Sequence, residues 1–112
     1  MSKPATRPYS RYGRDAVMLL GNLIRRARIE RKITVHELAE RAGVSRGLLQ
    51  RIEKGDPGCA VGAVFEAAAI VGVRLFDADQ AALTNAVSAQ AATLTLLPKA
   101  VRAAKVVAND EF

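Results

Sequence analysis

Three side chains that can recognise DNA bases lie within six residues of one another: Arg46, Gln50 and Arg51. An arginine guanidinium can donate two hydrogen bonds to guanine, and a glutamine amide can bind adenine. Base recognition requires these groups to stand on a rigid element narrow enough for the major groove, which an α-helix provides. Side chains of these types could therefore read base edges if one helix held them together.

The surrounding residues predict two short helices joined by a tight turn. Thr34 and Glu37 have the spacing of a capping box, so a helix should begin directly after Thr34. Gly43 stands where that helix needs a left-handed final residue, and Ser45 can cap a second helix that ends at Gly55. Two short helices with this connection form a helix-turn-helix.

The order of residues in this stretch resembles the Cro/CI-type repressors, also called the xenobiotic-response-element (XRE) family. The resemblance extends over roughly residues 16 to 73. It is carried by Ile33, Thr34, Glu37-Leu38-Ala39, Gly43-Val44-Ser45 and Arg51-Ile52-Glu53-Lys54-Gly55. It implies an all-α, five-helix, lambda-repressor-like DNA-binding domain.

The resemblance also implies roles for individual residues. The base-reading positions would be Arg46, Gly47, Gln50 and Arg51. A structural ion pair would join Arg28 to Glu53, whereas the rest of the basic run from Arg25 to Lys32 is typical of a solvated helix face. Hydroxyls at the helix caps and a lysine near the next loop are expected to contact phosphates: Thr34, Ser45 and Lys54. Gly47 and Val35 depart from the family, which often has a base-reading side chain and a bracing glutamine there.

Residues outside the motif indicate a narrower relationship. The segments 51–58, 61–62, 71–76, 96–99 and 101–102, followed by an acidic end at Phe112, resemble HipB-like antitoxins. This resemblance implies an antitoxin that represses its own operon and binds a HipA-type kinase toxin. A stand-alone repressor of phage or metabolic type remains an alternative, and a protein-interaction adaptor is a second one.

Composition narrows the possible functions. The net charge of +6 favours an anionic partner, nucleic acid first and a membrane surface second. A single cysteine and a single histidine argue against a disulfide or a zinc site. The sequence offers no nucleophile–base pair, so we do not expect an enzyme. We expect no cofactor, no membrane-spanning segment and a cytoplasmic, nucleoid-associated location.

The chain divides by composition into four segments. Residues 1–14 should be a flexible basic arm, 15–76 the helix-turn-helix domain, 77–97 a C-terminal dimerisation helix and 98–112 a flexible tail. The first helix is expected from a cap at Asp15 to about Glu30.

The C-terminal part of the domain should form the dimer surface. An isolated strand of four residues is not stable, so the β-prone segment Val73, Arg74, Leu75 and Phe76 should either pair with the same strand of a second copy or pack as a loop. A fifth helix should follow, capped by Asp77 or Asp79 and continuing to about Ala92. A homodimer would bind a palindromic operator with half-sites about one helical turn apart.

Overall fold

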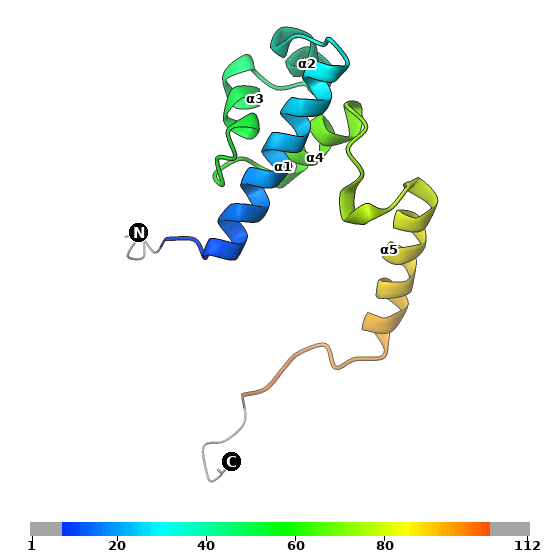
Figure 1. The fold of residues 1–112 in the computed structure, drawn as a ribbon. Helices are drawn as coiled ribbons and strands as arrows, with labels where there is room; N and C mark the ends of the chain where they lie inside the picture. Colours follow the sequence, from blue (N-terminus) through cyan, green and yellow to red (C-terminus); the bar gives the residue numbers. More distant parts are fainter. Residues whose placement is uncertain (1–7, 104–112) are drawn as a thin grey trace. The chain divides into compact units, whose positions relative to one another are not determined.

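The computed structural model describes residues 8–103, and all regular structure in that range is helical. The elements are α1 (Arg11–Glu30), α2 (Val35–Ala42), α3 (Arg46–Glu53), α4 (Val61–Ile70), the short 3₁₀ helix η1 (Leu75–Asp77) and α5 (Gln80–Thr95) (Figure 1). The expected all-α, five-helix fold is confirmed. The chain divides into two compact units, Met1–Asp77 and Ala78–Phe112.

Capping residues set the boundaries of α2 and α3, as the sequence predicts. The Thr34 hydroxyl accepts the Glu37 N–H at 3.0 Å, and the Glu37 carboxylate accepts the Thr34 N–H at 2.9 Å. Gly43 ends α2 in the left-handed conformation, with φ of 72°. The Ser45 hydroxyl then accepts the Leu48 N–H at 3.0 Å and begins α3.

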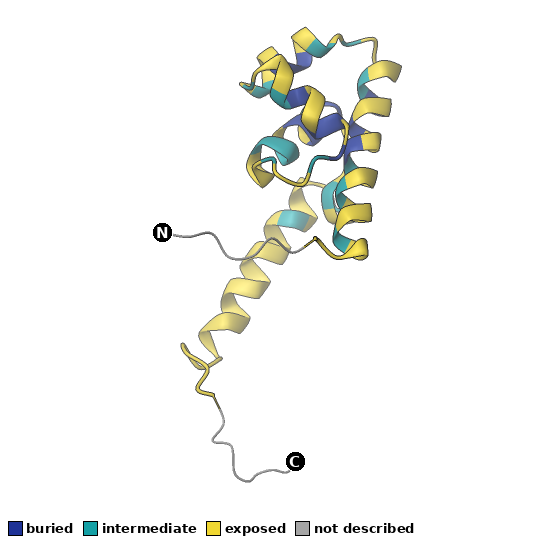
Figure 2. Cartoon of the chain, turned by 90° about the vertical axis from the view of Figure 1, so that its left-hand side faces the viewer, coloured by how far each residue is buried: buried dark blue, intermediate teal, exposed yellow. Residues whose placement is uncertain are grey.

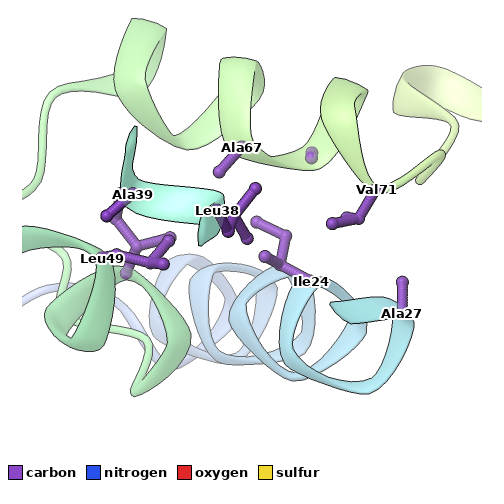
Figure 3. Packing of buried hydrophobic residues seen from close by; sticks show 9 residues of the cluster. Ile24, Ala27, Leu38, Ala39, Leu49, Ala67 and Val71 are labelled. Carbon is purple, nitrogen blue, oxygen red and sulfur yellow. The ribbon is translucent and has the colours of Figure 1, made fainter. Parts of the chain in front are cut away.

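The core of the first unit lies where α1, α2, α3 and α4 meet. Leu38 of α2 is fully buried between Ile24 of α1 and Ala67 of α4 (Figure 3). The buried hydrophobic residues are Ile24, Ala27, Leu38, Ala39, Leu49, Ile52, Ala67, Ala68 and Val71, all in the first unit (Figure 2). Small alanines let the helices approach closely, so a core of modest volume can hold four helices together.

The backbones of α1 and α3 come into direct contact at Gly21. A Cβ atom added to this buried glycine would lie 2.5 Å from the carbonyl oxygen of Ile52 and 3.1 Å from that of Glu53. Only a residue without a side chain fits this crossing. The close approach fixes the position of α3 against the first helix.

The first helix begins earlier than expected. Its N-cap is Ser10, whose hydroxyl accepts the Gly13 N–H at 3.0 Å, and Asp15 lies inside the helix. Residues 11–14, expected to belong to the flexible arm, are therefore helical. The nearby prolines and arginines indicated an irregular segment, so Ser10 was not predicted as a cap. Residues 1–7 of the expected arm lie outside the described residues.

Of the two possibilities for residues 73–76, the single chain has the packed segment and not the strand. Leu75 begins η1, and both Phe76 and Asp77 have left-handed backbone angles, with φ of 57° and 51°. An extended strand requires negative φ at these positions. Without a neighbouring strand to pair with, this segment instead turns and packs beside α4.

The second unit contains the last helix. Asp79 is its N-cap, because the Asp79 carboxylate accepts the Ala82 N–H at 2.9 Å, and the helix continues to Thr95 rather than ending near Ala92. It has no charged residue within its bounds, and apart from Leu83 all its residues are exposed. In the expected tail, residues 98–103 form no helix or strand, and residues 104–112 lie outside the described range.

Candidate nucleic-acid interface

The starts of α2 and α3 together form an open groove on the surface of the first unit. Its lining residues are Thr34, Val35, His36, Arg46, Gly47 and Gln50. The fold thus brings one expected phosphate contact, Thr34, beside three of the four expected base-reading positions. Arg46 and Gln50 lie one turn apart on an exposed face of α3, a spacing that suits neighbouring base pairs.

The two helix caps leave hydrogen-bond donors for a ligand. The Thr34 and Ser45 hydroxyl oxygens each accept a backbone N–H, so the hydroxyl protons are available to another acceptor. The capping box also holds the Glu37 carboxylate in its charged form, since the hydrogen bond from the Thr34 N–H lowers the Glu37 pKa. These contacts fix the helix starts before any partner binds.

The structure places Arg51 apart from the other base-reading candidates. Its Nε donates to the Asp56 carboxylate at 2.8 Å, and the other Asp56 oxygen accepts the Gly58 N–H at 2.7 Å. The Arg51 hydrogen bond is the main cause of a lowered Asp56 pKa, and the same bond raises the Arg51 pKa. Arg51 therefore ties α3 to the following loop, an arrangement that its position in the helix did not reveal.

Arg28 and Glu53 form the ion pair that the family resemblance implies. Arg28 Nε and Nη2 donate to the two Glu53 oxygens at 2.6 and 3.0 Å, and Arg28 Nη1 donates to the Ile33 carbonyl at 3.0 Å. Both side chains are nearly buried, at 11% and 6% exposed. The pair connects α1, the loop before α2 and the end of α3. Its hydrogen bonds to Glu53 are the first cause of a raised Arg28 pKa.

A second groove adjoins the first through the residues they share, Val35 and Gln50. It is lined by Arg25, Arg28, Val35, Gln50, Glu53 and Lys54, so the expected phosphate contact Lys54 lies beside the expected base-reading residue Gln50. Among the described residues, Ser45 and Arg51 line neither groove. Arg25 was predicted to belong to a solvated basic face, and the structure places it in the lining of this groove. Its position one turn after Gly21 was the available signal.

The four expected dimer residues also line a groove, on a different face. Val73, Arg74, Leu75 and Phe76 form one wall. The other lining residues are apolar and come from α1 and α4: Ala16, Leu19, Leu20, Leu23 and Phe65. Phe76 packs edge-on against Phe65, with ring centroids 6.3 Å apart, yet remains 79% exposed. The segment thus presents a large apolar side chain to solvent without forming a strand.

No helix in the described part of the chain is long and apolar enough to cross a membrane.

A search of curated proteins and a search of solved structures gave no match. A family model described as a helix-turn-helix domain matches residues 19–83, more than half of the chain. All lining residues of the two grooves that share Val35 and Gln50, and the whole of α2, α3 and α4, lie within this match. The chain therefore belongs to this helix-turn-helix domain family, whose members are DNA-binding regulators of the XRE type.

Proposed function

We propose that the protein is a sequence-specific transcriptional repressor that inserts α3 into the major groove of its operator. The observation that carries this proposal is the groove in which Arg46, Gly47 and Gln50 lie beside the capped start of α2. Arg46 and Gln50 supply base contacts, and Gly47 lets the α3 backbone approach the DNA closely. Thr34, Ser45 and Lys54 supply phosphate contacts that fix the docking angle.

Arg51 was expected to read a base, and its ion pair changes the role that we propose for it. With its guanidinium held by Asp56 at 2.8 Å, Arg51 would have to break that contact to reach a base edge. The pair is partly exposed, so its rupture would cost little. We assign base reading first to Arg46 and Gln50. The role that we propose for Arg51 is to hold the loop after α3 in its conformation through Asp56.

A homodimer is the proposed active form, because one domain of this size contacts too few base pairs for specificity. The exposed Phe76 and the apolar groove around it support an interface between two copies. Two copies related by a two-fold axis would bind a palindrome with half-sites about 34–36 Å apart.

The finer proposal is that this repressor is a HipB-like antitoxin. The resemblance of segments 51–58, 61–62, 71–76, 96–99 and 101–102 to that group supports it. The protein would then repress its own operon and hold a HipA-type kinase toxin in a complex. A stand-alone repressor of phage or metabolic type would share the DNA chemistry and lack the kinase partner.

Selection of bound sequences from a pool of random duplexes tests the repressor. The expected result is enrichment of one palindrome by the wild-type protein, with loss of sequence preference in Arg46→Ala and a cost of about 1–3 kcal/mol per base contact. Recovery of no duplex above background by the wild-type protein would instead favour an adaptor. Co-expression with a kinase encoded next to the gene tests the antitoxin, and separate elution of the two proteins at micromolar concentration would leave the stand-alone repressor.

A further inference from the structure

We propose that Arg25 and Lys54 together bind one backbone phosphate of the DNA, in the second groove beside the recognition helix. Arg25 comes from the middle of α1 and Lys54 from the end of α3, and both line this groove with Gln50. This inference rests on the proposed function, since it assigns a phosphate to a protein that binds duplex DNA.

The charges in the groove leave Arg25 and Lys54 as its available cations. Glu53 is the groove's one carboxylate, and both of its oxygens accept hydrogen bonds from Arg28. Arg28 uses its remaining donor group on the Ile33 carbonyl. Among the described residues, neither Arg25 nor Lys54 forms an ion pair. The Arg28–Glu53 pair is neutral overall, so the groove carries two net positive charges and favours an anion.

The fold explains how a residue of the first helix reaches the recognition helix. Gly21 allows the α1 backbone to touch the α3 backbone at Ile52 and Glu53. Arg25 lies four residues further along α1 and therefore one turn above this contact, on the same face as Gly21. A longer residue at position 21 would separate the helices and move Arg25 away from Lys54.

Neighbouring Arg26 provides a matched control. It belongs to the same helix and carries the same charge, but its Nε donates to Glu30 at 3.1 Å and it does not line the groove. Long-range attraction to DNA would be reduced about equally by removing either arginine. A direct phosphate contact would make Arg25 matter more.

The experiment measures binding to a short fluorescein-labelled duplex of arbitrary sequence by anisotropy, over a series of salt concentrations. The variants are Arg25→Ala, Arg26→Ala, Lys54→Ala and the double variant Arg25→Ala/Lys54→Ala, each in the full chain and each checked for an unchanged thermal midpoint. Loss of one phosphate contact should reduce the slope of log K against log salt by about 0.9. We expect that reduction for Arg25→Ala and Lys54→Ala and a smaller one for Arg26→Ala.

Sharing one phosphate predicts that the two losses are not additive. The double variant should then have a slope close to that of either single variant, and Arg25→Lys should recover part of the affinity. Equal effects of Arg25→Ala and Arg26→Ala, with normal wild-type binding, would overturn the shared phosphate site while leaving the proposed function intact. If the wild-type protein showed no salt-dependent binding to any duplex, the proposed function itself would fail, and this inference with it.

Discussion

Arg28 and Glu53 face each other across the junction of α1 and α3, with guanidinium and carboxylate joined by two hydrogen bonds of 2.6 and 3.0 Å. A third bond from Arg28 to the Ile33 carbonyl extends this junction to the loop before α2. The two side chains are nearly buried and line the groove that also contains Gln50 and Lys54. The position of α3 therefore depends on a contact between residues far apart in the sequence.

Removing one member of this pair should greatly lower the free energy of unfolding of the domain. Glu53→Met leaves the Arg28 guanidinium buried with a single acceptor, and breaking such a pair costs about 3–5 kcal/mol. The double variant Arg28→Met/Glu53→Met leaves no uncompensated charge and should be more stable than Glu53→Met alone. Chemical denaturation monitored by circular dichroism measures both. A double variant less stable than either single one would contradict the prediction.

Gly21 and Gly62 should respond in opposite ways to the same substitution. Gly21→Ala places a methyl group 2.5 Å from the Ile52 carbonyl, and relieving that overlap costs about 1–3 kcal/mol. Gly62 lies in α4 with no heavy atom within 4 Å of the added Cβ, so Gly62→Ala should stabilise the protein by roughly 0.5–1 kcal/mol. Thermal or urea denaturation of both variants tests the pair, and equal effects would show that the α1–α3 contact is looser than described.

The capping box should make stability depend on pH through Glu37. The folded-state pKa of Glu37 lies below the ordinary value of 4.5, chiefly because its carboxylate accepts the Thr34 N–H. A lowered folded pKa contributes stability above the unfolded pKa and loses it as the pH falls through the folded value. The thermal midpoint at pH 7 should be higher for the wild-type protein than for Glu37→Gln, since glutamine keeps the hydrogen bond without the charge. This difference in thermal midpoint should shrink as the pH falls below the ordinary pKa of a glutamate. A difference that stays constant down to strongly acidic pH would refute the assignment.

How much of this architecture can be predicted depends on the sequence distance over which each residue acts. Thr34, Glu37, Gly43 and Ser45 were predictable, because each acts on backbone groups at most three residues away along the chain or on its own φ angle. The role proposed for Arg25 was not predictable. It depends on the crossing of α1 and α3, which brings together residues as far apart in the sequence as Arg25 and Ile52, 27 positions from each other.

Two further features depend on neighbours that a local pattern does not supply. The β-prone residues at 73–76 left open a strand paired with a second copy or a packed segment, and in the single chain Phe76 and Asp77 adopt left-handed angles. Arg51 has the residue type and helix position of a base reader, but Asp56, five residues later, holds its guanidinium. The loop residue Asp56 therefore decides where the Arg51 guanidinium lies in the single chain. The Arg28–Glu53 pair, 25 residues apart, was anticipated through family resemblance and not through spacing.

Phe76 should be needed for association of two copies. The residue is 79% exposed at the edge of an apolar groove, and burying a phenylalanine contributes about 1.5–3 kcal/mol. Phe76→Asp should therefore raise the dimer dissociation constant at least tenfold, as measured by sedimentation equilibrium. Tyr12→Asp is the control, since Tyr12 is 88% exposed on α1 and lies outside that groove. Matching effects of the two substitutions would point to a dimer surface elsewhere.

Gly47 offers a test that separates protein stability from DNA binding. A Cβ added at Gly47 would meet only the Ser45 hydroxyl, at 3.9 Å, so nothing in the domain requires glycine there. Gly47→Ala should stabilise α3 by roughly 0.5–1 kcal/mol, because glycine inside a helix is unfavourable. If the α3 backbone approaches the DNA at this residue, the same methyl group should weaken operator binding by about 1–3 kcal/mol through overlap at the contact. The variant would then be more stable and bind more weakly, a combination that general damage to the fold cannot produce. Unchanged affinity would show that a space remains between Gly47 and the bases, and that Arg46 and Gln50 reach the DNA from a helix seated less deeply than proposed.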